Sequence, residues 1–117
     1  MPRGPDNYQL QVLLQELHPH ALKSNFWKRV VEEINRPSRQ RRMVNVYKIE
    51  QNAQNGETVL VPGKVLSVGE LKKKVEVAAI GFSAEAKQKI LAAKGKILSI
   101  HELLQKNPEG KNVRILG

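Results

Sequence analysis

The chain has 117 residues, of which 40% are hydrophobic, so its length allows one domain with a modest core. It carries 20 Lys and Arg residues against 11 Asp and Glu, and the resulting formal net charge of +9 predicts a polyanionic partner. Cysteine is absent, which excludes disulfides and thiolate metal sites. Only 4% of the residues are aromatic, which argues against a surface that stacks unpaired bases and favours duplex or folded RNA held by its phosphates.

The first half of the chain is predicted to be helical, because its hydrophobic residues recur at helical spacing. Asp6 or Asn7 caps the first helix, and the His18-Pro19-His20 break ends it. In the second helix, Trp27 stands among aliphatic residues, which indicates a core side chain rather than a base-stacking ring. The second and third helices are expected over residues 24–35 and 44–54.

A basic loop is expected over residues 36–43, and it begins with the sequence Arg36-Pro-Ser-Arg-Gln-Arg-Arg42. This stretch has four guanidinium groups in seven residues and no carboxylate. It cannot be buried, because each guanidinium needs water or an anion. The planar N–H donors match phosphate oxygens in pairs, so the loop is predicted to bind a nucleic-acid backbone. The side chains concerned are those of Arg36, Arg39, Arg41 and Arg42.

In the second half, short β-branched runs alternate with helical ones. Ser83 caps one helix, and Ser99 to Glu102 form a capping box for another. The pattern predicts an α/β fold in which the helical half, residues 6–55, precedes a small mixed sheet with helices on one side of it, over residues 56–117. Strands are expected over residues 58–61, 64–66, 75–80, 97–98 and 113–116, and helices over residues 84–93 and 99–106.

Pro62-Gly63-Lys64 has two interpretations. A phosphate loop of the Walker type is excluded, because the places of its second glycine and its Ser or Thr are taken by Thr58 and Val65. One interpretation is a turn or bulge, which leaves residues 58–66 as two strands or one bent strand. The other is close approach of Gly63 and Lys64 to a sugar-phosphate backbone.

Lysines elsewhere also have two interpretations. Lys72, Lys73 and Lys74 lie between two predicted strands, where they either decorate an exposed hairpin end or contact phosphates. Lys87 and Lys89 belong to the helix that Ser83 caps, and we expect both to face solvent.

Nothing in the sequence indicates an enzyme. There is no nucleophile beside a base, no diagnostic pair of carboxylates and no glycine-rich cofactor turn. His18 and His20 flank a proline far from His101, so surface or capping roles are expected rather than metal ligation. No cofactor and no metal are therefore expected. No targeting segment or long apolar run is visible, which predicts a soluble, cytoplasmic protein.

The four runs that begin at Arg36, Glu57, Val77 and Asn107 together resemble the large-subunit ribosomal protein family called L-eighteen-e, in its short archaeal-type form. The resemblance covers nearly the whole chain, and its most specific pieces are Val61-Pro-Gly-Lys-Val-Leu66 and Asn107-Pro-Glu-Gly110. The runs are Arg36-Pro-Ser-Arg-Gln-Arg-Arg-Met-Val-Asn-Val-Tyr-Lys-Ile-Glu50, Glu57-Thr-Val-Leu-Val-Pro-Gly-Lys-Val-Leu-Ser-Val-Gly-Glu-Leu71, Val77-Ala-Ala-Ile-Gly-Phe-Ser83 and Asn107-Pro-Glu-Gly-Lys-Asn-Val-Arg-Ile-Leu116.

The resemblance implies a composite fold related to that of bacterial ribosomal protein L-fifteen, and a structural role without catalysis. It implies binding to large-subunit ribosomal RNA, as a monomer beside other large-subunit proteins, with no membrane or small-molecule partner. The arginine loop, with Asn45 and Lys48 behind it, is implied as the principal RNA contact, and the Pro62-Gly63-Lys64 turn as a second one. Two alternatives remain: a free-standing regulator that binds RNA or DNA, and an RNA-processing enzyme that docks its substrate on a basic surface.

Overall fold

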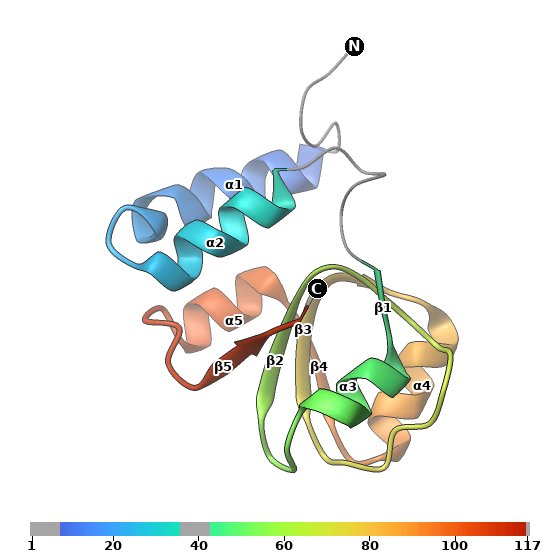
Figure 1. Ribbon diagram of the computed structural model, residues 1–117. Helices are drawn as coiled ribbons and strands as arrows, with labels where there is room; N and C mark the ends of the chain where they lie inside the picture. Colours follow the sequence, from blue (N-terminus) through green and yellow to red (C-terminus); the bar gives the residue numbers. More distant parts are fainter. Residues whose placement is uncertain (1–7, 36–42, 117) are drawn as a thin grey trace.

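The computed structural model describes residues 8–35 and 43–116, and it confirms the α/β class (Figure 1). After the first two helices, strands and helices alternate as the sequence predicts, except that β3 follows β2 with no helix between them. The helices are α1 (Tyr8–Ala21), α2 (Asn25–Ile34), α3 (Val46–Asn52), α4 (Ala84–Ala92) and α5 (Ile100–Lys106). The strands are β1 (Met43–Asn45), β2 (Thr58–Leu66), β3 (Glu76–Phe82), β4 (Lys96–Ser99) and β5 (Val113–Ile115).

Strand β2 is the centre of the sheet. The strand order is β1-β2-β3-β4, and β5 also pairs with β2. All four pairings of the described strands are parallel, whereas the sequence suggested a mixed sheet. β3 runs along one edge of β2, so β5 and β1 share the other edge, where β5 pairs from Thr58 and β1 pairs up to Leu66.

The Pro62-Gly63 pair is a bulge within one strand. The pairing of β2 with β3 shifts register between Val61 and Lys64, so residues 58–66 form a single bent strand. Proline cannot donate to a neighbouring strand, which explains why the shift falls here. On the opposite edge, the bulge separates the part of β2 that pairs with β5 from the part that pairs with β1.

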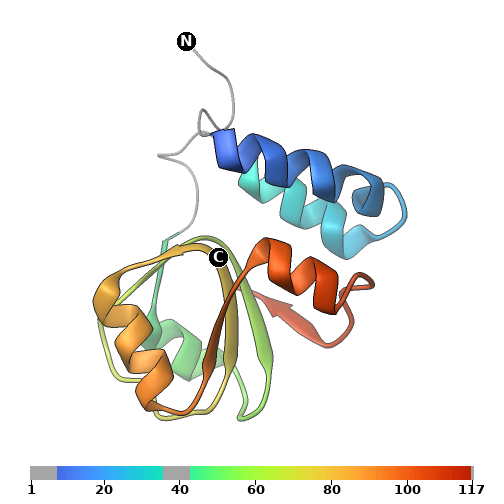
Figure 2. The ribbon, with the colours of Figure 1, turned by 180° about the vertical axis from the view of Figure 1, so that it is seen from behind.

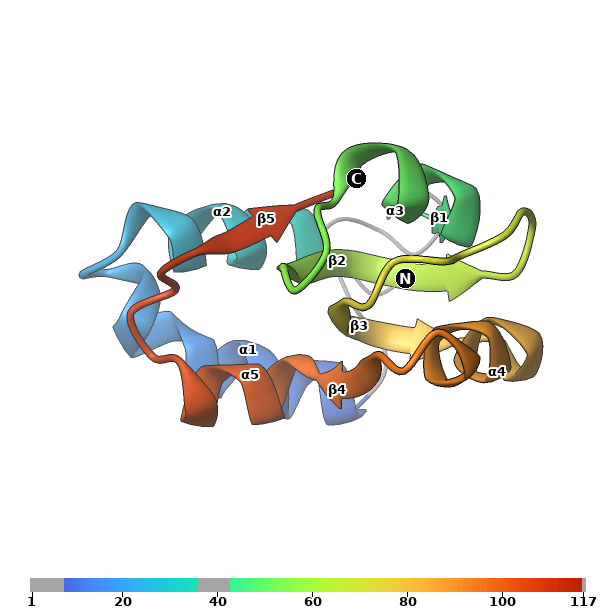
Figure 3. The same cartoon turned by 90° about the horizontal axis from the view of Figure 1, so that it is seen from below.

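Helices cover both faces of the sheet, so the expectation that they lie on one side is wrong. Val59 and Val61 point into a cluster that includes residues of α3 and α4, whereas Leu60 points into a cluster with α1, α2 and α5. Figures 1, 2 and 3 show these two groups of helices on opposite sides of β2 and β3. A parallel strand buried on both faces reads as a continuous apolar run, as residues 58–61 do.

The boundaries of α1 and α3 differ from the predicted ones. α1 continues through Pro19 to Ala21, because its packing against α2 and α5, through the buried Leu17, offsets the one backbone bond that the proline removes. The third helix begins at Val46 rather than Val44, because the preceding residues pair with β2 as strand β1. The cap proposed at Asp6 or Asn7 lies outside the described residues.

The three other helix starts are capped by serines. The hydroxyl of Ser24 accepts from the backbone N–H of Trp27, and that of Ser83 accepts from Ala86. Ser99 and Glu102 form the predicted capping box, in which each side chain accepts from the other residue's backbone N–H. The backbone donor from Ser99 lowers the pKa of Glu102. These caps confirm the starts of α2, α4 and α5.

The Asn107-Pro-Glu-Gly110 turn is clamped onto α2. The indole Nε1 of Trp27 donates a hydrogen bond of 2.8 Å to the carbonyl oxygen of Pro108, and the ring is fully buried, which confirms its core role. Gly110 has a φ of +68°, and a Cβ there would lie 2.4 Å from Cδ2 of Phe26. The turn therefore requires glycine both for its backbone and for its contact with the Phe26 ring.

Gly110→Ala should destabilise the protein more than Gly56→Ala does. Both glycines have positive φ, so each alanine costs about 1–2 kcal/mol of backbone strain. No atom lies within 4 Å of a Cβ at Gly56, whereas one at Gly110 overlaps Phe26 and adds about 1–3 kcal/mol. Urea unfolding of both variants measures the difference, and equal free energies of unfolding would contradict the clamp.

Candidate nucleic-acid interface

The first candidate surface lies at the carboxyl end of β2, beside the end of the arginine loop. Met43, the first described residue after the arginines, pairs with Lys64 across the β1–β2 ladder. Lys64 is exposed, whereas Gly63 is buried in the bulge. Of the two residues predicted to approach a sugar-phosphate backbone, Gly63 and Lys64, only Lys64 is therefore accessible to a partner. Arg36, Arg39, Arg41 and Arg42 lie outside the described residues.

Asn45 and Lys48 extend this surface onto α3. Lys48 is exposed, because Val46 and Ile49 occupy the buried side of the helix. Asn45 Oδ1 accepts a hydrogen bond of 3.2 Å from the backbone N–H of Val68, so it holds the loop that follows β2. Asn45 therefore has a structural role. Lys48 and Lys64 are thus the exposed cations of this surface.

The Lys72–Lys74 run belongs to a crossover and not to a hairpin end, because β2 and β3 are parallel. Its backbone is fixed by side-chain acceptors: Glu50 Oε1 accepts from the N–H groups of Lys72 and Lys73, and Asn55 Oδ1 accepts from that of Lys74. These donors, that of Lys72 first, lower the pKa of Glu50. The side chains then diverge. Lys73 Nζ donates to the carbonyl oxygens of Glu50 and Ala53, whereas Lys72 and Lys74 are exposed.

Lys89 also has an internal role, so the expectation that it faces solvent is wrong. Its Nζ donates to the carbonyl oxygens of Ser67 and Gly69, at 2.5 and 2.6 Å. Those carbonyls lie in the same crossover that Lys73 holds at its other end, and the backbone of this crossover also contacts Tyr47. Lys87 is exposed, as expected. Lys73 and Lys89 therefore stabilise the crossover, because their ammonium groups already donate hydrogen bonds to the protein's own carbonyl oxygens.

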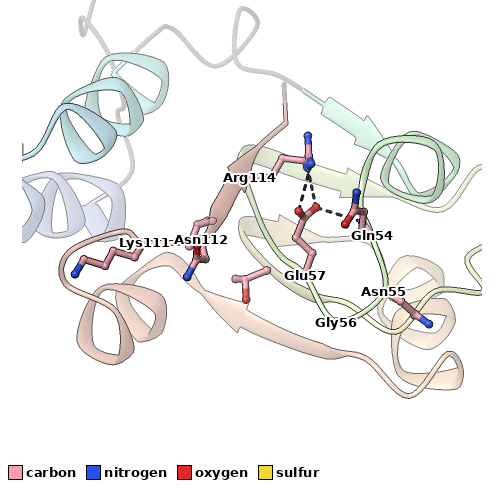
Figure 4. A pocket seen from close by; sticks show the side chains of 9 residues that line it. Gln54, Asn55, Gly56, Glu57, Lys111, Asn112 and Arg114 are labelled. Carbon is pink, nitrogen blue, oxygen red and sulfur yellow. Dashed lines mark hydrogen bonds and ion pairs between the residues drawn. The ribbon is translucent and has the colours of Figure 1, made fainter.

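At the opposite end of the strands, where their amino ends lie, the surface has a shallow open hollow of about 640 Å³ (Figure 4). Arg114 on β5 approaches Glu57 with both Nε and Nη2, at 2.7 and 3.2 Å, and the backbone N–H of Gln54 also donates to that carboxylate. The hydrogen bond from Arg114 lowers the pKa of Glu57. Lys111 pairs with Glu109 at 2.8 Å. The charges lining this hollow are thus largely compensated within the protein.

Beside that hollow, the carboxylate of Glu76 accepts hydrogen bonds from two side chains. Lys106 Nζ donates to both of its carboxylate oxygens, at 3.0 and 2.8 Å, and Thr58 Oγ1 donates to Oε1 at 3.3 Å. The hydrogen bond from Lys106 is the main cause that lowers the pKa of Glu76, and the charge of Lys96 adds to it. This carboxylate therefore links the start of β3 to α5.

The described residues hold no group of three or more His, Asp or Glu side chains that fits a metal ion. His101 instead pairs with Glu16, which joins α5 to α1. Over residues 8–35 and 43–116, no helix is long and apolar enough to cross a membrane.

Comparison with known proteins decides the family. A family model described as "Ribosomal protein 60S L18 and 50S L18e" matches residues 6–117. The chain belongs to this family. It is 43% identical over 117 residues to a protein of Pyrobaculum aerophilum, with 98% of this chain and 96% of that protein covered. The relative of Methanopyrus kandleri is 46% identical over 122 residues, with coverage of 98% and 96%. Both are named "Large ribosomal subunit protein eL18".

A third relative with the same name, from Sulfurisphaera tokodaii, is 41% identical over 113 residues, covering 97% of this chain and 94% of that protein. Membership confirms the resemblance read from the arginine loop, the Pro62-Gly63-Lys64 turn and the Asn107-Pro-Glu-Gly110 turn. As a member of a family of ribosomal proteins, the chain is a structural protein and not an enzyme.

Glu76→Gln should reduce the acid sensitivity of the fold. The pKa of Glu76 is lowered from 4.5, so its ionised form stabilises the protein above that pH, and this contribution is lost as the pH falls through the lowered value. The variant should be less stable than the wild type at pH 7, and the difference should shrink below pH 4.5.

Glu32→Gln serves as the control, because Glu32 is exposed on α2 and pairs with no described residue. Thermal unfolding measured between neutral and acidic pH follows all three proteins. A difference between Glu76→Gln and the wild type that stays constant with pH would contradict the role assigned to Glu76.

Proposed function

We propose that this protein is a structural constituent of the large ribosomal subunit, where it binds and stabilises the large-subunit ribosomal RNA through its arginine loop. Family membership and the names of its relatives support the role in the large subunit. The formal net charge of +9 supports a polyanionic partner. These observations favour a subunit component over the free-standing regulator and the RNA-processing enzyme that the sequence left open.

The observation that carries the RNA-binding proposal is the anchoring of both flanks of the arginine loop. On one side, α2 ends at Ile34, which is fully buried, and on the other, Val44 in β1 is 1% exposed. The nine residues between these two points of the core, residues 35–43, include the four arginines. A cationic segment whose ends are fixed loses less conformational freedom on binding than a free tail does. Lys64 lies across the ladder from Met43 and extends the charge onto the sheet.

The mechanism is neutralisation of phosphates. The arginines bind phosphate oxygens with paired N–H donors, while the folded body fills a space between RNA helices and reads little sequence. If the loop, Lys48 and Lys64 contact about five phosphates, log affinity should fall with log salt at a slope of roughly −3.5 to −4.5. Further partners are neighbouring large-subunit proteins, with this chain present as a monomer.

Replacing Arg39, Arg41 and Arg42 together with alanine should flatten the salt slope of RNA binding by about two to three units, because three phosphate contacts are lost. The fold should be unchanged, since both anchors of the loop remain. The measurement is binding to deproteinised large-subunit ribosomal RNA over a series of salt concentrations.

The matched control replaces Lys23, Lys28 and Arg29 with alanine. These three cations are exposed, lie before or in the first half of α2 and are not part of the loop sequence, and their loss changes the net charge by the same amount. A loop variant that keeps the wild-type slope, or a control that flattens it equally, would show that the loop is not the specific contact.

A further inference from the structure

A second hollow, with a volume of about 480 Å³, lies at the amino ends of the strands, between the starts of β3 and β4. Glu76 is its single carboxylate, and Lys106 already holds that group. The lysines that line it are Lys74, Lys94, Lys96 and Lys106. We call this group the amino-edge lysines.

The backbone segments that carry three of these lysines are fixed to one another. Lys96 N–H donates to Val75 O at 3.0 Å, which joins the start of β4 to the residue after Lys74. A Cβ on Gly95 would lie 2.3 Å from the same Val75 oxygen, so only glycine permits this approach. Lys94 has a φ of 66°, which turns the chain from α4 into β4. The lysines are thus held side by side by the fold.

The charge of this hollow is not compensated by the described residues. Lys74, Lys94 and Lys96 are exposed and form no ion pair within the part of the chain that the structure describes. Four lysines against one carboxylate leave a net charge of +3 around the hollow, as 4 − 1. In the hollow of Figure 4, by contrast, Arg114 is paired with Glu57. Like charges gathered by a rigid backbone attract an anion.

We propose that the amino-edge lysines bind phosphates of a second RNA segment, separate from the one at the arginine loop. This inference rests on the proposed function, because it takes RNA as the partner. The hollow is lined by one large apolar side chain, that of Val75, so it lacks the nonpolar anchor that a peptide would need. Lysine ammonium groups act as point charges that suit backbone phosphates without reading sequence.

The two basic surfaces lie at opposite ends of the strands. Lys96 pairs with Glu76 at the start of β3, whereas Lys64 pairs with Gly81 near its end. The seven residues of β3 span about 20 Å at about 3.3 Å per residue. This distance exceeds the spacing of adjacent phosphates, so the two surfaces contact phosphates that are not neighbours along a strand, as two separate RNA segments would supply.

The test replaces Lys74, Lys94 and Lys96 with glutamine, which keeps side-chain length and removes charge, while Lys106 stays in place to hold Glu76. Deproteinised large-subunit ribosomal RNA is the probe. The salt slope should flatten by about two to three units. The Arg39, Arg41 and Arg42 variant should flatten it independently, and the combined variant should show the sum.

The control replaces Lys23, Lys28 and Arg29 with glutamine, and thermal unfolding checks that every variant is folded. An unchanged slope in the lysine variant would overturn the second contact and leave the arginine-loop proposal standing, since the arginine variant is measured separately. Equal flattening by the control would also overturn it, because net charge alone would explain the effect.

A second measurement separates RNA from a protein neighbour. Intact large subunits are treated with an acetylating reagent, and the modified lysines are identified by mass spectrometry. Lys74, Lys94 and Lys96 should be protected in intact subunits and become reactive after ribonuclease digestion. Protection that survives digestion would assign this surface to a protein neighbour, and reactivity in intact subunits would show that nothing covers it. Either result overturns the proposal.

Discussion

Burial of β2 on both faces is the constraint on which the rest of the structure depends. Val59 and Leu60 point to opposite sides, so the strand is stable only with a helical layer on each side. Its two edges carry the remaining strands, with β3 on one and β5 followed by β1 on the other. The apolar side chains of β2 are thereby buried, and Lys64 lies near one end of the strands while Lys74, Lys94 and Lys96 lie at the other. A polyanion that contacts both ends fits this distribution.

Local signals in the sequence predicted local structure well. Ser83 and Ser99 predicted the starts of α4 and α5, and Pro62-Gly63 predicted a turn or bulge, because each depends on hydrogen bonds or backbone angles within a few residues. Helical spacing predicted the start of α2. The layers were predicted wrongly. A short apolar run does not show how many faces it buries, and Pro19 does not end α1 because tertiary packing holds the helix together.

The site was predictable where cations are adjacent in the chain and not where the fold assembles them. The arginine loop is visible as a run, but Lys74, Lys94, Lys96 and Lys106 meet only through the parallel register of β3 and β4 and the close approach of Gly95. Lys73 shows the converse limit, since it belongs to a basic run and yet donates to two carbonyl oxygens of the protein itself. The net charge of a sequence therefore indicates that an anionic partner is needed, whereas the fold determines which cations can reach that partner.

The central claim is that the cations of this protein are compensated by the phosphates of ribosomal RNA. Sedimentation of a lysate of the native cells at increasing salt tests it most directly, with the protein followed by an antibody. The protein should travel with the large subunits at low salt and leave them only at high salt, as multiple phosphate contacts require. A protein that sediments mainly on its own at low salt, independent of the subunits, would contradict the claim.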